Sequence, residues 1–238
     1  MRFSERAGAY AAYRPAYPKA AIDALLRGLG PEADLIVADV GAGTGISTNL
    51  LAQRVGSVVA IEPNAQMRER AESRLNVRWE DGCAETLPLP DKSVDVAAAF
   101  QAFHWFDPLR AFAEFARVAR RRLALLQYER DETQPFCAAY AAIARRYATD
   151  DTEALRMRTL EIFSTLAGSG LRRAVVPFKQ RLTQEGLIGR VDSTSYLPRE
   201  GEAAAALRRE MARLFDRFAR DGFVEMALNA YVLAADVA

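Results

Sequence analysis

The sequence is poor in the residues that bind transition metals. It has one histidine, His104, and two cysteines, Cys83 and Cys137, which lie far apart and match no metal-ligand spacing. A structural zinc ion usually takes four ligands from Cys, His and acidic side chains. We therefore expect no metal site. The two isolated cysteines are typical of a protein kept in a reducing compartment, so we expect a cytoplasmic location.

Three further absences narrow the classes of partner. Lys and Arg together number 32 and Asp and Glu 31, so the chain lacks the basic excess that phosphate-binding proteins carry, and we expect no nucleic-acid partner. No run of about 18 apolar residues occurs, and residues 1–6 lack the apolar stretch of a signal peptide, so we expect no membrane partner. The oligomeric state cannot be read from the composition.

Half of the residues are hydrophobic, which is enough for a buried core. In the first half of the chain, short apolar runs that are typical of buried strands alternate with helical patterns. The expected strands are residues 35–40, 57–61, 77–79, 94–100 and 122–128, and the expected helices are residues 46–54, 64–74 and 108–117. This alternation predicts an α/β fold with a parallel sheet.

The regular alternation of strand and helix patterns ends after residue 128. Here we expect helices at residues 135–147, 152–166 and 201–220, and strands at residues 174–181 and 223–233. The whole pattern predicts a Rossmann-like, mostly parallel seven-stranded sheet with helices on both faces and a helical cap over the active site. We expect one domain over residues 1–238. Its expected parts are N-terminal lid helices (1–34), a cofactor-binding core (35–130), and the remaining edge strands with the helical cap (131–238).

A glycine-rich turn follows the first expected strand. Residues 39–45 read D-V-G-A-G-T-G, with glycines at 41, 43 and 45. Glycine lets the backbone approach a ligand closely, and the helix that follows directs free N–H groups at it. The turn therefore predicts a ligand site, and the alternative is a tight strand-to-helix connection without a ligand.

An acidic residue ends the second expected strand. Glu62 lies 21 residues after Gly41, where a carboxylate can accept hydrogen bonds from both hydroxyls of a ribose. The alternative is a solvated acid at a strand end. Together, the glycine turn and Glu62 favour a nucleoside-containing cofactor.

The glycine spacing separates two kinds of cofactor. A dinucleotide turn reads G-x-G-x-x-G, whereas this turn reads G-x-G-x-G and has Ile46 at the last position. Asp39 would repel a pyrophosphate but would favour a ligand that carries an ammonium group. The turn therefore favours an adenosyl amino acid, and a nicotinamide dinucleotide remains the alternative.

Three stretches resemble motifs of the class I S-adenosylmethionine-dependent methyltransferases, in particular the branch that acts on small molecules. They are D-V-G-A-G-T-G (39–45), A-I-E-P-N (60–64) and G-C-A-E-T-L-P-L-P-D-K-S-V-D-V (82–96). The similarity covers residues 35–105. It extends weakly to Y-R-P-A-Y-P (13–18) and S-T-S-Y-L-P (193–198). The resemblance implies a methyltransferase that uses S-adenosyl-L-methionine and a small-molecule acceptor. The alternatives are an NAD(P)-dependent oxidoreductase and a non-catalytic methyltransferase-like binding domain.

The resemblance also implies roles for residues of the turn and the second strand. The backbone of Gly41, Ala42 and Gly43 would line the methionine half of the cofactor. Asp39 would hold its amino group, directly or through water, and Glu62 would hold the ribose.

Further roles fall on the segments after the next strands. Pro63 would pack against the adenine face, and Cys83 and Ala84 would meet the adenine edge. Many relatives have Asp at the position of Cys83, and cysteine is a weaker acceptor. Gln101 would form a wall of the methionine pocket.

Three residues have roles that depend on more than the motifs. His104 could take a proton from the acceptor, or it could simply pack against the next helix. Tyr13 and Arg14 would belong to an N-terminal lid over the cofactor, with Arg14 near a carboxylate. The alternative for this lid is an aromatic stripe used only for packing.

Overall fold

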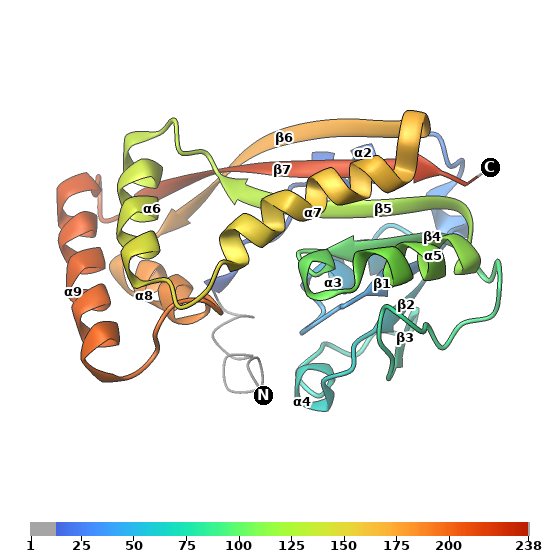
Figure 1. The fold of residues 1–238 in the computed structure, drawn as a ribbon, viewed down its shortest axis with the longest axis horizontal. Coiled ribbons are helices and arrows are strands. Elements are labelled where there is room, and N and C mark those ends of the chain that lie inside the picture. Colours follow the sequence, from blue (N-terminus) through green and yellow to red (C-terminus); the bar gives the residue numbers. More distant parts are fainter. Residues whose placement is uncertain (1–12, 238) are drawn as a thin grey trace. The chain divides into compact units, whose positions relative to one another are not determined.

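The computed structural model describes residues 13–237, which form a seven-stranded sheet with helices around it (Figure 1). The strands are β1 (Ile36–Val40), β2 (Ser57–Ile61), β3 (Val77–Glu80), β4 (Val94–Phe100), β5 (Ala119–Arg130), β6 (Leu171–Leu182) and β7 (Val224–Asp236). The α-helices are α2 (Lys19–Leu26), α3 (Ile46–Ala52), α4 (Ala65–Arg68), α5 (Pro108–Val118), α6 (Pro135–Tyr147), α7 (Thr152–Ala167), α8 (Gln184–Asp192) and α9 (Gly201–Phe218). Short 3₁₀ turns are η2 (Glu32–Asp34), η3 (Phe103–Trp105) and η4 (Gly168–Gly170).

The strand order is β3-β2-β1-β4-β5-β7-β6. The pairs β1–β2, β1–β4, β2–β3 and β4–β5 are parallel, and β7 runs opposite to β5 (Figure 1). The chain reverses strand order between β1 and β4, and ligands of open α/β sheets bind at such a point, beyond the carboxyl ends of the strands. The expected α/β fold with a mostly parallel seven-stranded sheet is confirmed.

The chain divides into two compact units, each built from segments that are far apart in sequence. Among the described residues, the sheet unit comprises Ala16–Tyr128, Glu153–Val176 and residues 230–237. The helical unit comprises residues 13–15, Glu129–Thr152 and Pro177–Asn229.

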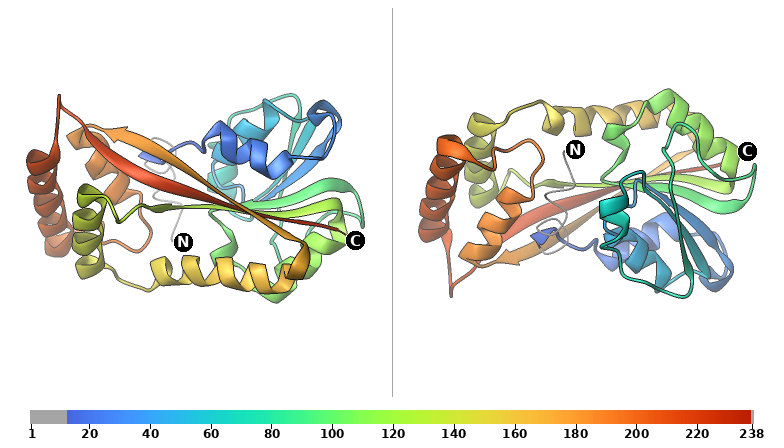
Figure 2. Two further views of the ribbon diagram at one scale, coloured as in Figure 1. Left: turned by 90° about the horizontal axis from the view of Figure 1, so that it is seen from above. Right: turned by 90° about the horizontal axis from the view of Figure 1, so that it is seen from below.

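Helices cover both faces of the strands in the sheet unit. Figure 2 shows α2 and α3 on one side and α5 and α7 on the other. The strands β1 and β4 are buried along nearly their whole length, as expected for parallel strands between two helical layers. Under α5 and α7, the ring of Phe103 packs edge-on against Phe115 and Phe163, at centroid distances of 6.1 and 5.5 Å. This apolar core fixes the segment that follows β4.

A buried arginine ties α2 to the sheet unit. The Arg122 side chain is 1 % exposed, its Nε lies 2.7 Å from Asp236 Oδ1, and its Nη1 donates to the carbonyls of Leu25 and Arg27. The strand expected at residues 122–128 begins with this arginine. The arginine is tolerated because its donors satisfy carbonyls at the end of a helix.

Replacing Arg122 with methionine is expected to lower the free energy of unfolding by about 2–4 kcal/mol, because two carbonyls lose their donor. Asp236→Asn is the matched control. Its side chain is 55 % exposed, so we expect a loss below about 1 kcal/mol. Urea unfolding measures both values, and equal losses in the two variants would contradict the structural role given to the carbonyl contacts.

The helical unit is held together by polar contacts between α6, α8 and α9. Arg208 on α9 binds Asp192 at the end of α8 at 2.8 Å. The Tyr147 hydroxyl at the end of α6 donates to Glu210 on α9 at 2.7 Å. On the inner face of α9, apolar side chains recur at helical spacing and are buried: Ala204, Leu207, Met211, Leu214 and Phe215.

Two helices differ from the expectation. The sequence pattern did not indicate α8, which is only nine residues long. The expected helix at residues 64–74 ends at Arg68. Residues 69–74 are mostly charged, and the next apolar residue, Leu75, is fully exposed, so a longer helix would have no apolar face to bury. Residues 1–12 of the expected lid lie outside the described residues.

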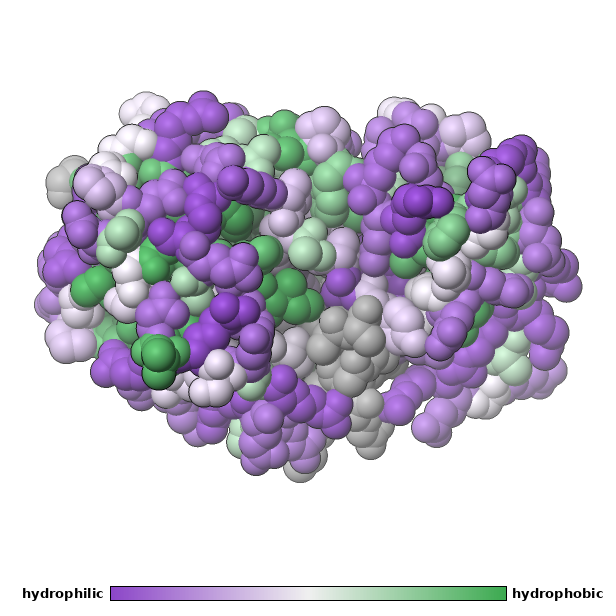
Figure 3. All heavy atoms as spheres, turned by 180° about the vertical axis from the view of Figure 1, so that it is seen from behind, coloured by the Kyte–Doolittle hydropathy of each residue, from purple (hydrophilic) through white to green (hydrophobic). Residues whose placement is uncertain are grey.

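Within residues 13–237, none of the helices combines the length and hydrophobicity that crossing a membrane requires. The face drawn in Figure 3 is mostly hydrophilic, with hydrophobic residues showing between charged ones.

Candidate functional site

The glycine turn is fastened to the end of the neighbouring strand. The N–H groups of Gly41 and Ala42 both donate to the carbonyl of Ile61, at 2.8 and 3.1 Å. Gly41 has φ +73°, and a Cβ atom there would lie 2.6 Å from the Ala102 Cβ and 2.9 Å from the Phe106 ring. Only glycine fits this position, because both the backbone conformation and the space exclude a side chain.

Glu62 lies directly beside the glycine turn. Its Oε2 accepts from the Gly43 N–H at 3.0 Å, and its Oε1 accepts from the Asn64 N–H at 2.9 Å. Burial raises the pKa of Glu62, and the two backbone N–H groups oppose that rise. The side chain is half-buried and each oxygen keeps a lone pair for a further donor. The parallel register of β1 and β2 brings this strand-end acid to the turn.

Asp39 is fully buried beneath the first turn of α3. Its Oδ2 accepts from the hydroxyls of Ser47 and Thr48, at 2.7 and 2.6 Å. Its Oδ1 has no hydrogen-bond partner among residues 13–237. Burial raises the pKa of Asp39 to about 6, against the lowering effect of the two hydroxyls. The structure therefore encloses a carboxyl group that is costly to ionise.

This burial predicts a stability that depends on pH. Below pH 3.8 both the folded and the unfolded chain keep the proton on Asp39. Between pH 3.8 and about 6 the unfolded chain releases it while the folded chain retains it, so stability falls as pH rises. Above pH 6 the full effect, on the order of 3 kcal/mol, is present.

Asp39→Asn removes this ionisation, and its amide oxygen can still accept from both hydroxyls. We expect the ligand-free variant to be more stable than the wild type at pH 7.5, and the difference to shrink at pH 4. Urea unfolding at the two pH values checks this, with the exposed Asp34→Asn as control. A variant that is less stable at pH 7.5 than at pH 4, relative to wild type, would contradict the prediction.

Three residues that were predicted to contact the adenine lie in the segments that follow β2 and β3. Pro63 is exposed directly after Glu62, Cys83 is exposed, and Ala84 is buried at 2 % exposure. Because Ile61 pairs with Glu80 in parallel register, these segments leave the same edge of the sheet. An exposed proline side chain next to Glu62 is compatible with an adenine ring packed against it.

Gln101 connects the end of β4 to β5. Its Nε2 donates to the Tyr128 carbonyl at 3.2 Å, and its Oε1 accepts from the Tyr128 N–H at 3.1 Å. The backbone at Gln101 has φ +50°, a conformation that non-glycine residues seldom adopt. Both ends of the amide thus bind the neighbouring strand, and this arrangement turns the chain toward His104.

His104 lies in η3 and is 7 % exposed. Its ring packs against that of Trp105 at a centroid distance of 4.6 Å, and Trp105 itself is 38 % exposed. The histidine is therefore a buried side chain behind an accessible tryptophan. Its function as a proton acceptor stays a prediction.

Tyr13 and Arg14 belong to the helical unit, where they are fastened to α8 and the residues after it. The ring of Tyr13 packs on Gly189, whose added Cβ would lie 2.4 Å from a ring carbon. Arg14 Nη2 donates to the Ser193 carbonyl at 3.1 Å. The expected contact of Arg14 with the cofactor stays a prediction.

The sheet unit contains the carboxyl ends of β1, β2 and β4 and the predicted proton acceptor His104. It also contains these residues that were expected to bind the cofactor: Asp39, Gly41, Ala42, Gly43, Glu62, Pro63, Cys83, Ala84 and Gln101. Sequence reasoning missed the hydroxyls of Ser47 and Thr48. Two adjacent hydroxyl residues eight and nine positions after an acid, in the first turn of a helix, could have indicated them.

Comparisons with known proteins agree with this geometry. A family model described as a methyltransferase domain matches residues 38–125. An uncharacterized methyltransferase of Mycobacterium tuberculosis is 39 % identical over 202 residues, covering 82 % of this chain and 77 % of the relative. A methyltransferase-like protein of Schizosaccharomyces pombe is 30 % identical over 192 residues, covering 79 % of this chain and 75 % of the relative.

Solved structures share the fold. A protein named as a type II methyltransferase from Anaeromyxobacter dehalogenans has a TM-score of 0.69 at 24 % identity, over 94 % of this chain and 98 % of that one. The YcgJ protein of Bacillus subtilis has a TM-score of 0.55 at 19 % identity, over 92 % and 99 %. The relatives are methyltransferases, so the nicotinamide-dependent oxidoreductase is no longer an alternative. The chain belongs to the class I S-adenosylmethionine-dependent methyltransferases.

Proposed function

We propose that this protein binds S-adenosyl-L-methionine at the glycine turn and transfers its methyl group to a small-molecule acceptor. The observation that carries the proposal is the Glu62 carboxylate, which is held beside the turn by the N–H groups of Gly43 and Asn64. A carboxylate in this position can accept hydrogen bonds from the two hydroxyls of a ribose.

The residues of the turn fit such a ligand. The buried Asp39 Oδ1 and Thr44 Oγ1 have no hydrogen-bond partner among residues 13–237. A Cβ atom added to Gly43 would meet only the Met67 sulfur, at 3.6 Å, so a ligand can approach the backbone there. An ammonium group, acting directly or through water, would supply the donor that Asp39 lacks.

When bound, S-adenosylmethionine supplies an activated methyl group on a sulfonium. The protein's task is then to hold and orient both partners, and correct alignment contributes roughly 7–11 kcal/mol to such reactions. Glu62 would fix the ribose, Asp39 the amino group, and Pro63, Cys83 and Ala84 the adenine. Gln101, bound to Tyr128, would keep the wall of the methionine pocket in place.

His104 is the candidate to accept a proton where the acceptor must lose one. A positioned base contributes on the order of 10²–10⁴-fold, and an acceptor that is already nucleophilic needs none. The His104 ring is 7 % exposed and packs against the more accessible Trp105, so an acceptor would approach the histidine beside this tryptophan.

Calorimetric titration with S-adenosylhomocysteine tests the proposal. We expect one binding site per chain and no binding of NADH under the same conditions. A thermal-shift screen of small metabolites in the presence of S-adenosylhomocysteine then identifies candidate acceptors, and methyl transfer to a hit distinguishes an enzyme from a non-catalytic binding domain. Absence of S-adenosylhomocysteine binding would refute the proposal.

A further inference from the structure

A short turn follows β3 at the edge of the sheet where the proposed function places the adenine. Within residues 83–86, the N–H of Thr86 donates to the carbonyl of Cys83 at 3.3 Å. Gly82, just before this turn, lies close to Ile61, because an added Cβ would be 3.1 Å from the Ile61 Cγ2 atom. Ile61 is also the residue whose carbonyl accepts from the glycine turn. We call residues 83–86 the adenine turn.

One backbone N–H of the adenine turn is suited to contact a base. Ala84 is 2 % exposed, and its N–H has no acceptor among the residues that the structure describes. A buried backbone donor is costly to leave unpaired. The N1 atom of adenine is an acceptor, whereas N1 of hypoxanthine carries a hydrogen and would face this N–H as a second donor. A turn held in the correct place would therefore distinguish the two bases.

Two side chains of α5 hold the backbone just after the adenine turn. Glu114 Oε2 accepts from the Leu87 N–H at 2.7 Å. Arg117 donates to the carbonyls of Leu87 and Leu89, at 3.2 and 2.8 Å. Glu114 and Arg117 also bind each other through two hydrogen bonds of 2.7 Å, which hold the pKa of Glu114 below its ordinary value. One forked ion pair thus binds the loop backbone from both of its partners.

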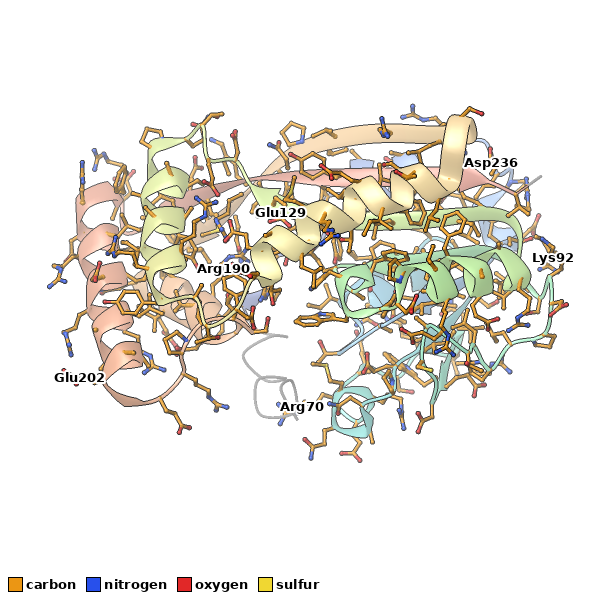
Figure 4. The ribbon with its side chains drawn as sticks, in the orientation of Figure 1. Arg70, Lys92, Glu129, Arg190, Glu202 and Asp236 are labelled. Atoms are coloured by element: carbon orange, nitrogen blue, oxygen red, sulfur yellow. The ribbon has the colours of Figure 1, made fainter. Side chains whose placement is uncertain are left out.

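Further contacts join α5 to the same segment on either side of this pair. Glu85, in the adenine turn, accepts through Oε1 from the N–H of Asp107, the residue that caps the first turn of α5, at 2.8 Å. Lys92 lies on the loop that leads into β4 (Figure 4), and its N–H donates to the Arg117 carbonyl at 2.9 Å. The Lys92 ammonium group donates to the Ala116 carbonyl at 3.1 Å. The position of the adenine turn is therefore coupled to a single helix.

The ion pair is directed at the loop more than at the stability of its own helix. Apolar side chains already bury one face of α5: Ala111, Phe115 and Val118. The side chains of Glu114 and Arg117 are 18 % and 31 % exposed, and partly exposed ion pairs contribute little to the free energy of unfolding. The donors of Arg117 that do not bind Glu114 go to the segment before β4. The main effect of the pair is therefore on where this segment lies.

We propose that Glu114 and Arg117 are positioning residues, which hold the Ala84 N–H where it selects an acceptor atom of the base. This inference rests on the proposed function. The two side chains act through the backbone of residues 87–89 and would not touch the cofactor themselves. Their loss should lower the selectivity for the base, whereas Glu62, which comes from β2, should still hold the ribose.

The test compares S-adenosylhomocysteine with S-inosylhomocysteine, in which hypoxanthine replaces adenine. Calorimetry on the wild type should show a preference for the adenine ligand of roughly 5- to 150-fold, the range for a buried group that loses its hydrogen-bond partner. Arg117→Lys keeps the charge but loses the fork, and Glu114→Gln directs an amide nitrogen at a donor. In both variants we expect the preference to fall to about twofold or less, because the adenine ligand loses its contact. The affinity for S-inosylhomocysteine should stay that of the wild type.

Arg54→Lys is the matched control for a purely structural effect. Arg54 forms the same forked pair with Glu32, through two hydrogen bonds of 2.8 Å, and its side chain is 22 % exposed. Glu32 precedes β1, so this pair lies near the amino ends of the strands rather than at the ligand site. We expect Arg54→Lys to keep the base preference of the wild type, even where its melting temperature falls.

The outcomes distinguish positioning from stability. Equal binding of the two ligands by the wild type would overturn the inference, whatever the variants do. An unchanged preference in Arg117→Lys and Glu114→Gln, or equal weakening of both ligands, would also overturn it, since the pair would then have only a structural role. Both side chains are partly exposed, so we expect both variants to fold, and where one does not, the other decides. A wild type that binds neither ligand would instead refute the proposed function.

Discussion

Replacing Glu62 with glutamine is expected to weaken S-adenosylhomocysteine binding roughly 10- to 150-fold. Hydrogen bonds to a charged group contribute about 1.5–3 kcal/mol, and the neutral amide cannot replace the carboxylate toward two ribose hydroxyls. The amide nitrogen would also face the N–H of Gly43 or Asn64, which now donates to a carboxylate oxygen. Calorimetry measures the change in Kd.

A neighbouring acid provides the matched control for this variant. Glu72 is exposed and pairs with Arg74 at the surface, so Glu72→Gln removes the same charge without touching the turn. We expect its affinity to match the wild type. Affinity of Glu62→Gln within about twofold of the wild type, in a variant with a normal melting temperature, would remove Glu62 from the cofactor site.

Gly41→Ala is expected to lower the free energy of unfolding by about 2–5 kcal/mol. A left-handed conformation costs alanine about 1–2 kcal/mol, and the overpacking of a methyl group against its neighbours adds typically 1–3 kcal/mol. The new Cβ would lie 2.6 Å from the Ala102 Cβ and 2.9 Å from the Phe106 ring. Urea unfolding measures the loss, and the displaced turn should also abolish S-adenosylhomocysteine binding.

The variant Gly30→Ala separates the cost of the left-handed backbone conformation from the cost of overpacking. Gly30 has a similar φ of +83°, but an added Cβ would meet nothing within 4 Å. We expect this control to lose only the conformational part, about 1–2 kcal/mol. The double variant Gly41→Ala/Ala102→Gly should recover part of the difference. Equal losses for Gly41→Ala and Gly30→Ala would show that the turn has room for a side chain.

Short sequence patterns were sufficient to predict the buried strands, because each strand is marked by an apolar run of a few consecutive residues. The runs at residues 35–40, 57–61 and 94–100 correspond to β1, β2 and β4, because a strand buried on both faces reads as an unbroken apolar run. The helix α8 was missed, since its nine residues show fewer than three helical turns. The end of α4 was misplaced because packing, rather than propensity, decides where such a helix stops.

The candidate site shows the same limit. The glycine turn and Glu62 could be located because glycines and a strand-end acid at a fixed spacing mark the first two strands. The partners of Gln101 could not, because its amide binds the backbone of Tyr128, 27 residues away. Likewise, the sequence pattern singled out Arg14 and residues 193–198 separately, and only the fold brings Arg14 to Ser193.

The hydrogen bond from the Gly43 N–H to the Glu62 carboxylate has a consequence for the kinetics of ligand binding. The carboxylate accepts from two backbone N–H groups of the protein itself, so the shape of the loop does not depend on contacts with a nucleoside. Association should then follow a single exponential whose rate rises linearly with ligand concentration, rather than levelling off at the rate of a preceding rearrangement. Substitutions in a site of this kind should therefore change the affinity mainly through the dissociation rate rather than the association rate.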